Sequence, residues 1–119
     1  MDSNFERLWR CAEQTKLPGF VRSVSYGTPS LKLGSTFLAR IREKNVLAIH
    51  CPIEEKPHLL EAAPEIYFET DHYKGWPYIL IHLEQITNEE LEHRIRIAWK
   101  ARAPARLRKL ADAPHEQRP

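Results

Sequence analysis

The chain is predicted to fold as an α+β protein, in which an antiparallel β-sheet is flanked by helices at the N- and C-terminal ends of the sequence. Three observations predict this class. Amphipathic helical patterns lie near both ends of the 119 residues, short segments rich in β-branched and aromatic residues lie between them, and tight-turn sequences separate those segments. Consecutive strands between terminal helices favour an antiparallel sheet with the helices packed against one face.

The first predicted helix begins near Ser3. Ser3 and Glu6 have the spacing of a capping box, in which each side chain satisfies a free backbone N–H of the other residue. Apolar residues then recur on one helical face, namely Phe5, Leu8, Trp9 and Ala12. The dipeptide Pro18-Gly19 predicts the end of this helix.

Four short strands are predicted to follow as an antiparallel meander. Their ranges are 21–26, 30–33, 36–42 and 45–51. The turn sequences between them are Gly27-Thr28-Pro29, Gly34-Ser35 and Glu43-Lys44-Asn45. Arg40 and Arg42 share one face of their strand because side chains alternate, with Lys32 before this hairpin and Lys44 in its turn. Such a hairpin is suited to lie against a nucleic-acid groove, and it is equally typical of an ordinary sheet with a solvated outer face.

The next part of the chain predicts a short helix and two more extended segments. Residues 53–62 are expected to be helical, with Pro57 near the first turn. Residues 66–68 are expected to form a short extended piece. Residues 78–83 predict the strongest strand, because they are apolar on both faces apart from His82.

A second capping-box spacing, Thr87 and Glu90, predicts the start of the last long helix. Its apolar face is expected to contain Leu91, Ile95, Ala98 and Trp99. Pro104 is expected either to break this helix or to start another short one, and residues 105–110 are expected to continue as a turn.

Bulk properties predict one domain, residues 1–111, followed by a polar and disordered tail, residues 112–119. A composition of 42% hydrophobic and 29% charged residues is typical of a soluble globular protein. No apolar run approaches the roughly 20 residues that span a membrane, and the first residues do not have the pattern of a signal peptide. Cys11 and Cys51 lie in segments of different type, which favours two thiols in a reducing cytoplasm.

The sequence predicts neither a metal nor a cofactor. Glu69, Asp71, His72 and His82 are the nearest candidates for metal ligands, but the chain has no close pair of the His-x-x-x-His kind. A lone histidine in a strand is more often a core or surface residue.

No catalytic residue is expected either. The serines lack a Gly-x-Ser-x-Gly context, and the four glycines lie in separate turns, so no glycine-rich phosphate loop is present. Cys51 follows His50 directly, and adjacent strand residues point to opposite faces, so they cannot act as nucleophile and base. The protein is therefore expected not to be an enzyme.

Charge is distributed unevenly along the chain, whose formal net charge is only +2. Between residues 94 and 109 there are seven basic residues and no acidic residue, and they are Arg94, Arg96, Lys100, Arg102, Arg106, Arg108 and Lys109. Such a cluster suits a phosphate backbone, because binding there depends on local potential and counterion release. The alternative is a solvated helix face.

The stretch ETDHYKGWPY, residues 69–78, concentrates functional residue types. Gly75 permits a positive φ, and Pro77 removes a donor where the next strand begins, so Trp76 and Tyr78 can project from a fixed corner while Tyr73 and Trp76 close the end of the core. With Lys74 in solvent, this corner suits base stacking or phosphate contact. It also suits a structural plug at the end of the core.

Three segments resemble the MmcQ/YjbR family of small bacterial proteins. In chain order they are SYGTPSLKLGSTFLARI (25–41), PEIYFETDHYKGWPYILIHL (64–83) and AWKARAPARL (98–107). The matching positions are Tyr26, Gly27, Pro29 and Lys32, then Phe68, Tyr73, Gly75 and Pro77, and finally Trp99 with Ala103-Pro104. The resemblance implies a CyaY-like (frataxin-like) topology and a DNA-binding role through a double wing of β-hairpins. Frataxins bind iron on an acidic first helix, whereas Arg7, Arg10 and Lys16 accompany the acids here, so no iron is expected.

These observations predict a cytoplasmic, non-enzymatic DNA-binding domain, with no membrane partner and with its oligomeric state open. The expected phosphate contacts are Lys32, Arg40, Arg42, Lys74, Arg94, Arg96, Lys100 and Arg102. The alternative is a module that binds a small ligand or a protein in a pocket between the Tyr26–Pro29 turn and the His72–Tyr78 loop. The expected pocket residues are Tyr26, Lys32, His72, Tyr73, Lys74 and Trp76.

Overall fold

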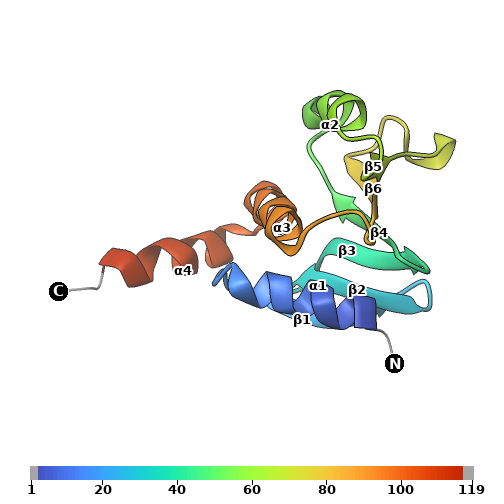
Figure 1. The fold of residues 1–119 in the computed structure, drawn as a ribbon. Helices are drawn as coiled ribbons and strands as arrows, with labels where there is room; N and C mark the ends of the chain where they lie inside the picture. The colour runs from blue at the N-terminus through green and yellow to red at the C-terminus, as the bar shows by residue number, and fades with distance from the viewer. Residues whose placement is uncertain (1–2, 117–119) are drawn as a thin grey trace.

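The computed structural model describes residues 3–116 and contains a single antiparallel sheet with helices on one face (Figure 1). The strands are β1 (Phe20–Ser25), β2 (Thr28–Leu33), β3 (Thr36–Glu43), β4 (Val46–His50), β5 (Tyr67–Phe68) and β6 (Tyr78–His82). The α-helices are α1 (Ser3–Gln14), α2 (Lys56–Ala62), α3 (Asn88–Arg102) and α4 (Ala105–Glu116), and the 3₁₀ turns are η1 (Ile53–Glu55) and η2 (Asp71–Tyr73).

The six strands have the order β1-β2-β3-β4-β6-β5, and every neighbouring pair is antiparallel. The first four form the expected meander, and β6 then inserts between β4 and β5. Strands β1 and β5 are the edges of the sheet, and β5 is only two residues long. The prediction of an α+β fold with terminal helices flanking an antiparallel sheet is therefore confirmed.

Side-chain alternation gives the sheet two different faces. On one face, residues such as Leu31, Ile49 and Ile81 are fully buried and form the main core. Helices α1 and α3 lie side by side over this face (Figure 1) and contribute Leu8 and Ile95 to the same core. The opposite face, here called the open face, carries only a small apolar cluster, which is Val46, Ala48 and Leu80 with Phe68 and Tyr73 packed against it.

The predicted elements lie close to their observed positions. The cap of the last long helix is confirmed, because the Thr87 hydroxyl accepts a hydrogen bond from the Glu90 backbone N–H at 3.1 Å. Of the two outcomes expected at Pro104, a new helix is the one observed, and the turn expected at residues 105–110 is wrong. Helix α4 continues to Glu116 and extends away from the sheet (Figure 1). Residues 117–119 of the predicted tail lie outside the described residues.

Helix α4 forms after Pro104 because a proline is tolerated at the start of a helix, where its missing N–H leaves no bond unmade. The Pro104 carbonyl accepts hydrogen bonds from the backbone of Leu107 and Arg108. The Leu107 side chain is 2% exposed and approaches Gly19, where an added Cβ would lie 2.5 Å from Leu107 Cδ1. A side chain at Gly19 would displace the buried Leu107 side chain and would strain a backbone that has φ +95°. No helix within residues 3–116 has the length and apolar character that a bilayer crossing requires.

The guanidinium of Arg7 joins helix α1 to the loop that leads into α3. Arg7 Nη1 donates to the Leu83 carbonyl and Nη2 donates to the Ile86 carbonyl, each at 2.6 Å. Arg7 Nε donates to Asn88 Oδ1 at 2.5 Å. These bonds satisfy backbone groups near the N-terminus of α3 and fix the position of this helix beside α1.

Replacing Arg7 by Met (R7M) is expected to lower the free energy of unfolding by about 2–4 kcal/mol, because it leaves partly buried carbonyls without a charged donor. The matched variant R10M changes an exposed arginine on the same helix and is expected to cost no more than about 0.5 kcal/mol. Urea denaturation of both variants measures the difference. Equal stability of R7M and R10M would contradict the proposed role of Arg7.

Candidate functional site

The open face of the sheet contains a pocket with a volume of about 820 Å³. It is lined by Ser25, Tyr26, Lys32, Ser35, Phe37, Arg40, Ala48, His72, Tyr73, Trp76 and Tyr78. These residues come from strands β2, β3, β4 and β6, the β1–β2 turn, the β2–β3 turn and the loop before β6. The volume lies within the range of small-molecule sites, which is roughly 300–1,000 Å³.

The pocket has one small side chain, Ala48, at the middle of the open face. Ala48 of β4 lies in register between Arg40 of β3 and Leu80 of β6. On the far side of Arg40, its partner in β2 is Ser30. Larger side chains stand around this low centre, so a hollow remains above Ala48.

Aromatic rings form one wall at the end of the strands. Phe37 of β3 and Tyr78 of β6 have ring centroids 5.9 Å apart. His50, the register partner of Tyr78, meets that ring edge-on with centroids 5.4 Å apart. These contacts fix the rings against one another and therefore give the wall a defined shape.

The β1–β2 turn places a second aromatic residue at the rim. Tyr26 has φ +53° and Gly27 has φ +77°, which is the two-residue hairpin geometry that favours Gly, Asn or Asp. A tyrosine in this left-handed conformation costs free energy, and the Tyr26 side chain is 90% exposed, so it gains little from packing. The Arg40 guanidinium lies 5.1 Å from the Tyr26 ring centroid and donates to Thr28 Oγ1 at 3.2 Å. Tyr26 and Arg40 therefore form one unit at the mouth of the pocket.

The remaining wall is the segment of residues 69–77, here called the aromatic loop. Tyr73 packs against the small apolar cluster of the open face, and the Arg42 guanidinium lies 5.5 Å from its ring. Trp76, by contrast, is 61% exposed. Gly75 has φ +80°, the conformation expected for it. Within the loop, Tyr73 therefore packs against the sheet, whereas Trp76 is exposed and lines the pocket.

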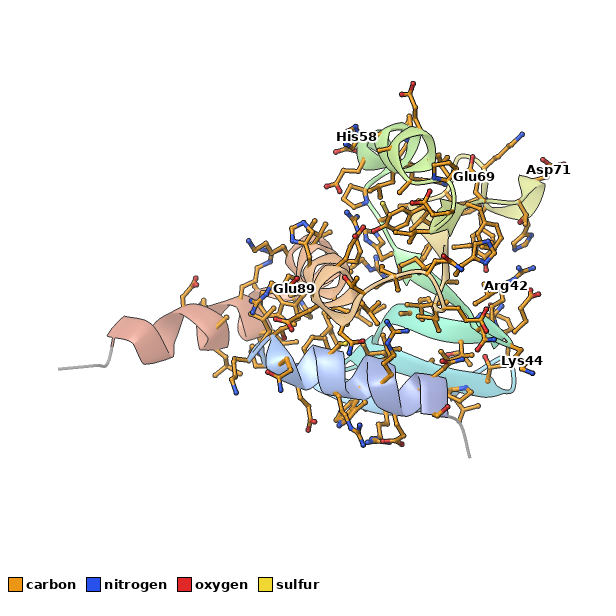
Figure 2. The ribbon with its side chains drawn as sticks, in the orientation of Figure 1. Arg42, Lys44, His58, Glu69, Asp71 and Glu89 are labelled. Atoms are coloured by element: carbon orange, nitrogen blue, oxygen red, sulfur yellow. The ribbon has the colours of Figure 1, made fainter. Side chains whose placement is uncertain are left out.

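The ammonium group of Lys56 holds the aromatic loop in place from behind. Lys56 is the first residue of α2, and its side chain is buried. Nζ donates to the Tyr73 carbonyl at 2.9 Å and to the Trp76 carbonyl at 2.8 Å. It also forms an ion pair with Glu69 Oε1 at 2.7 Å. Figure 2 shows Glu69 between α2 and the η2 turn that carries Asp71.

The residues predicted for the pocket are brought together with one exception. Tyr26, Lys32, His72, Tyr73 and Trp76 all line the hollow. Lys74 is not among the lining residues, and its exposed side chain pairs with Asp71 at 3.3 Å. Sequence reasoning assigned Arg40 to the DNA-contacting set alone, and it missed Phe37, Ala48 and Lys56. Predicting from strand alternation that Arg40 and Ala48 share a face requires the β3–β4 register, which the sequence does not give.

The residues predicted to contact DNA do not form one surface. Lys32, Arg40 and Arg42 lie on the open face, whereas α3 covers the opposite face. Four of the eight pair with carboxylates, as Arg42–Glu43 at 3.2 Å, Lys74–Asp71 at 3.3 Å, Arg94–Glu55 at 3.1 Å and Arg96–Glu92 at 3.5 Å. Figure 2 shows Arg42 and Lys44 near the tip of the β3–β4 hairpin, away from α3.

Two of the α3 cations are used inside the protein. Arg94 is 4% exposed, and its Nη2 lies 3.3 Å from the Cys51 sulfur as well as beside Glu55. It therefore has no surface from which to contact a phosphate. Arg102 Nη2 donates to the Phe37 carbonyl at 3.4 Å, whereas Lys100 is exposed. Among the described residues, no three His, Cys, Asp or Glu side chains converge as metal ligands.

Comparison with known proteins yields a partial match. No family model matches the chain. A segment of 49 residues is 39% identical to the uncharacterized protein Rv2570 of Mycobacterium tuberculosis and equally to the uncharacterized protein Mb2600 of Mycobacterium bovis. The match covers 41% of this chain and 38% of the length of each relative. The similarity to these bacterial proteins therefore covers less than half of this chain and less than half of each relative.

Removing the Lys56 ammonium (K56M) is expected to lower the free energy of unfolding by about 2–4 kcal/mol, because two carbonyls and the Glu69 carboxylate lose their common partner. Backbone amides of the aromatic loop should then exchange with solvent faster. The matched variant K74M breaks an exposed ion pair on the same loop and should cost less than about 1 kcal/mol. Urea denaturation and hydrogen exchange test this, and unchanged loop protection in K56M would contradict it.

His50 is expected to make stability depend on pH. It is 8% exposed, and burial together with the nearby charge of Arg102 lowers its pKa from 6.5 to about 4. Because the unfolded state binds this proton more readily, the stability contributed by neutral His50 is complete above about pH 6.5 and is lost as the pH falls toward 4. The loss is about 3 kcal/mol. Urea denaturation across this range should show a shallower pH slope in H50Q but not in H58Q, which changes an exposed histidine.

Proposed function

We propose that the protein is a non-enzymatic binding module that takes a small ligand in the open-face pocket. One observation carries this proposal. Segments that are far apart in the sequence, namely the Tyr26 turn, the centre of the sheet at Ala48 and the aromatic loop, surround a single hollow of about 820 Å³. A concave site lined by aromatic rings and a few polar groups is the usual form of a small-molecule site.

Two further features support a ligand role for these residues. Tyr26 adopts a costly backbone conformation and stays 90% exposed, and Trp76 is also mostly exposed. Neither side chain is explained by core packing, because both lie outside the main core. Strain and exposed aromatic surface at the same site favour contact with another molecule.

Duplex DNA is the second candidate, and Lys32 with Arg40 on the open face is the observation that favours it. A duplex groove requires a continuous cationic surface. The distribution of the predicted contacts over two faces, with four of them paired to acids, supports the pocket more strongly. The DNA prediction and the MmcQ/YjbR resemblance with its CyaY-like topology remain proposals.

The non-enzymatic part of the proposal rests on the chemistry of the pocket lining. No carboxylate or thiol is among the residues that line it. The two cysteines are buried free thiols, and burial raises the pKa of both Cys11 and Cys51, which makes them poor nucleophiles. Free thiols also agree with the proposed location in the reducing cytoplasm.

Filling the hollow tests the proposal. Replacing Ala48 by Leu (A48L) adds an aliphatic side chain at the centre of the pocket, whereas S23L adds the same side chain to the outer strand β1 on the same face. A panel of neutral, anionic and cationic aromatic fragments should shift the amide NMR signals of pocket residues in the native protein and in S23L. In A48L, the apparent affinity measured from these shifts should be at least about tenfold lower.

A short DNA duplex is titrated in parallel under several salt concentrations. We expect weak binding of the duplex that A48L leaves unchanged. If the duplex binds tightly with a steep salt dependence, while no fragment perturbs the pocket of the native protein, the small-ligand proposal is wrong and the DNA candidate is favoured.

A further inference from the structure

Positive charge in the pocket is not compensated by protein acids. Among the described residues, neither Lys32 nor Arg40 forms an ion pair, although nearby Arg42 and Lys74 both do. Arg40 uses one guanidinium nitrogen on the Thr28 hydroxyl and stacks on Tyr26. Its remaining N–H groups stay available to an acceptor, because a guanidinium carries five donors.

The two cations face the same space. Arg40 is the register partner of Ser30, and Lys32 is the partner of Phe37, so the two basic residues are diagonal neighbours on adjacent strands. The β2–β3 register shifts between Leu31 and Lys32, and both long cationic side chains still reach the same hollow. Both line the pocket, and no acid lines it with them. The pocket is therefore complementary to an anionic group.

The rim supplies flat surfaces for a second part of a ligand. Tyr26 is 90% exposed and Trp76 is 61% exposed, and they stand on different segments at the mouth of the hollow. Tyr73, Phe37 and Tyr78 provide further ring surface inside it. Exposed rings of this kind bind planar groups by stacking.

We propose that the pocket takes a planar aromatic ring that carries an anionic group, with the anion at Lys32 and Arg40 and the ring against the aromatic rim. This inference rests on the proposed function, because it assigns the ligand class of the same site. Nucleoside monophosphates and aromatic carboxylates share this chemistry. An anion without a ring, or a ring without an anion, satisfies only part of the site.

Five probes separate these contributions: adenosine monophosphate, adenosine, inorganic phosphate, naphthoate and naphthalenemethanol. Each is titrated against the intact protein while the indole N–H signal of Trp76 is followed by NMR, with the signal assigned from W76F. Either anionic ring compound should bind at least about tenfold more tightly than its neutral counterpart and than phosphate. Whichever of the two anionic compounds binds more tightly identifies the source of the anion as a phosphate or a carboxylate.

Variants locate the anion. Replacing Lys32 by Gln (K32Q) should lower the affinity for the tighter-binding anionic probe about tenfold and leave the affinities for the neutral probes unchanged. The matched variant K44Q removes an exposed lysine from the β3–β4 turn and should leave all affinities unchanged. R40Q repeats the test on the second cation, and the fold of each variant is checked by its amide NMR spectrum.

The possible failures are distinguishable. If neutral rings bind as tightly as anionic rings and K32Q has no effect, the pocket remains a ligand site and the anionic class is wrong. If phosphate binds as tightly as the anionic ring compounds, the aromatic part of the inference is wrong. If no probe and no fragment shifts the NMR signal of a pocket residue, both this inference and the proposed function are wrong.

Discussion

The buried ammonium of Lys56 is the interaction on which the candidate site depends. A lysine side chain leaves water at a considerable cost unless its charge is matched, and here two carbonyls and one carboxylate match it. All three partners belong to the aromatic loop. The contacts that stabilise the lysine charge therefore also fix the backbone that carries Tyr73 and Trp76, so one buried cation positions the aromatic loop that lines part of the pocket.

The unequal faces of the sheet explain where a pocket can form. Helices α1 and α3 cover one face and contribute to its main core. The open face has only a small apolar cluster, and its centre is occupied by Ala48. Tall side chains from neighbouring strands and from two turns surround this low point. The pocket is thus a consequence of side-chain size on a half-covered sheet, and the edge position of the Tyr26 turn and the aromatic loop determines its rim.

Arginines and lysines of the same charge have different roles in this fold. Arg7 binds backbone carbonyls between two helices, and Arg94 is buried beside Glu55 and Cys51. Lys56 is also buried. Lys32 and Arg40, by contrast, line the pocket, and no acidic residue lines it with them. Counting basic residues along the chain therefore overstates the cationic surface, because a guanidinium satisfies buried acceptors as readily as it contacts a ligand.

The sequence by itself determined the fold class and the approximate position of every strand, because period-two patterns, turn residues and helix caps are local signals. Its alternative prediction grouped Tyr26, Lys32, His72, Tyr73 and Trp76 with Lys74, from motifs in two separate segments. It left open whether Pro104 ends α3 or starts a new helix, and the close contact that Leu107 of α4 makes with Gly19 is seen only in the structure. Nor could the sequence show which basic residues are buried, that Lys56 anchors the aromatic loop, or that Ala48 leaves a hollow beside Arg40. Those features depend on strand register and on contacts between residues distant in the chain, and only the tertiary structure decides them.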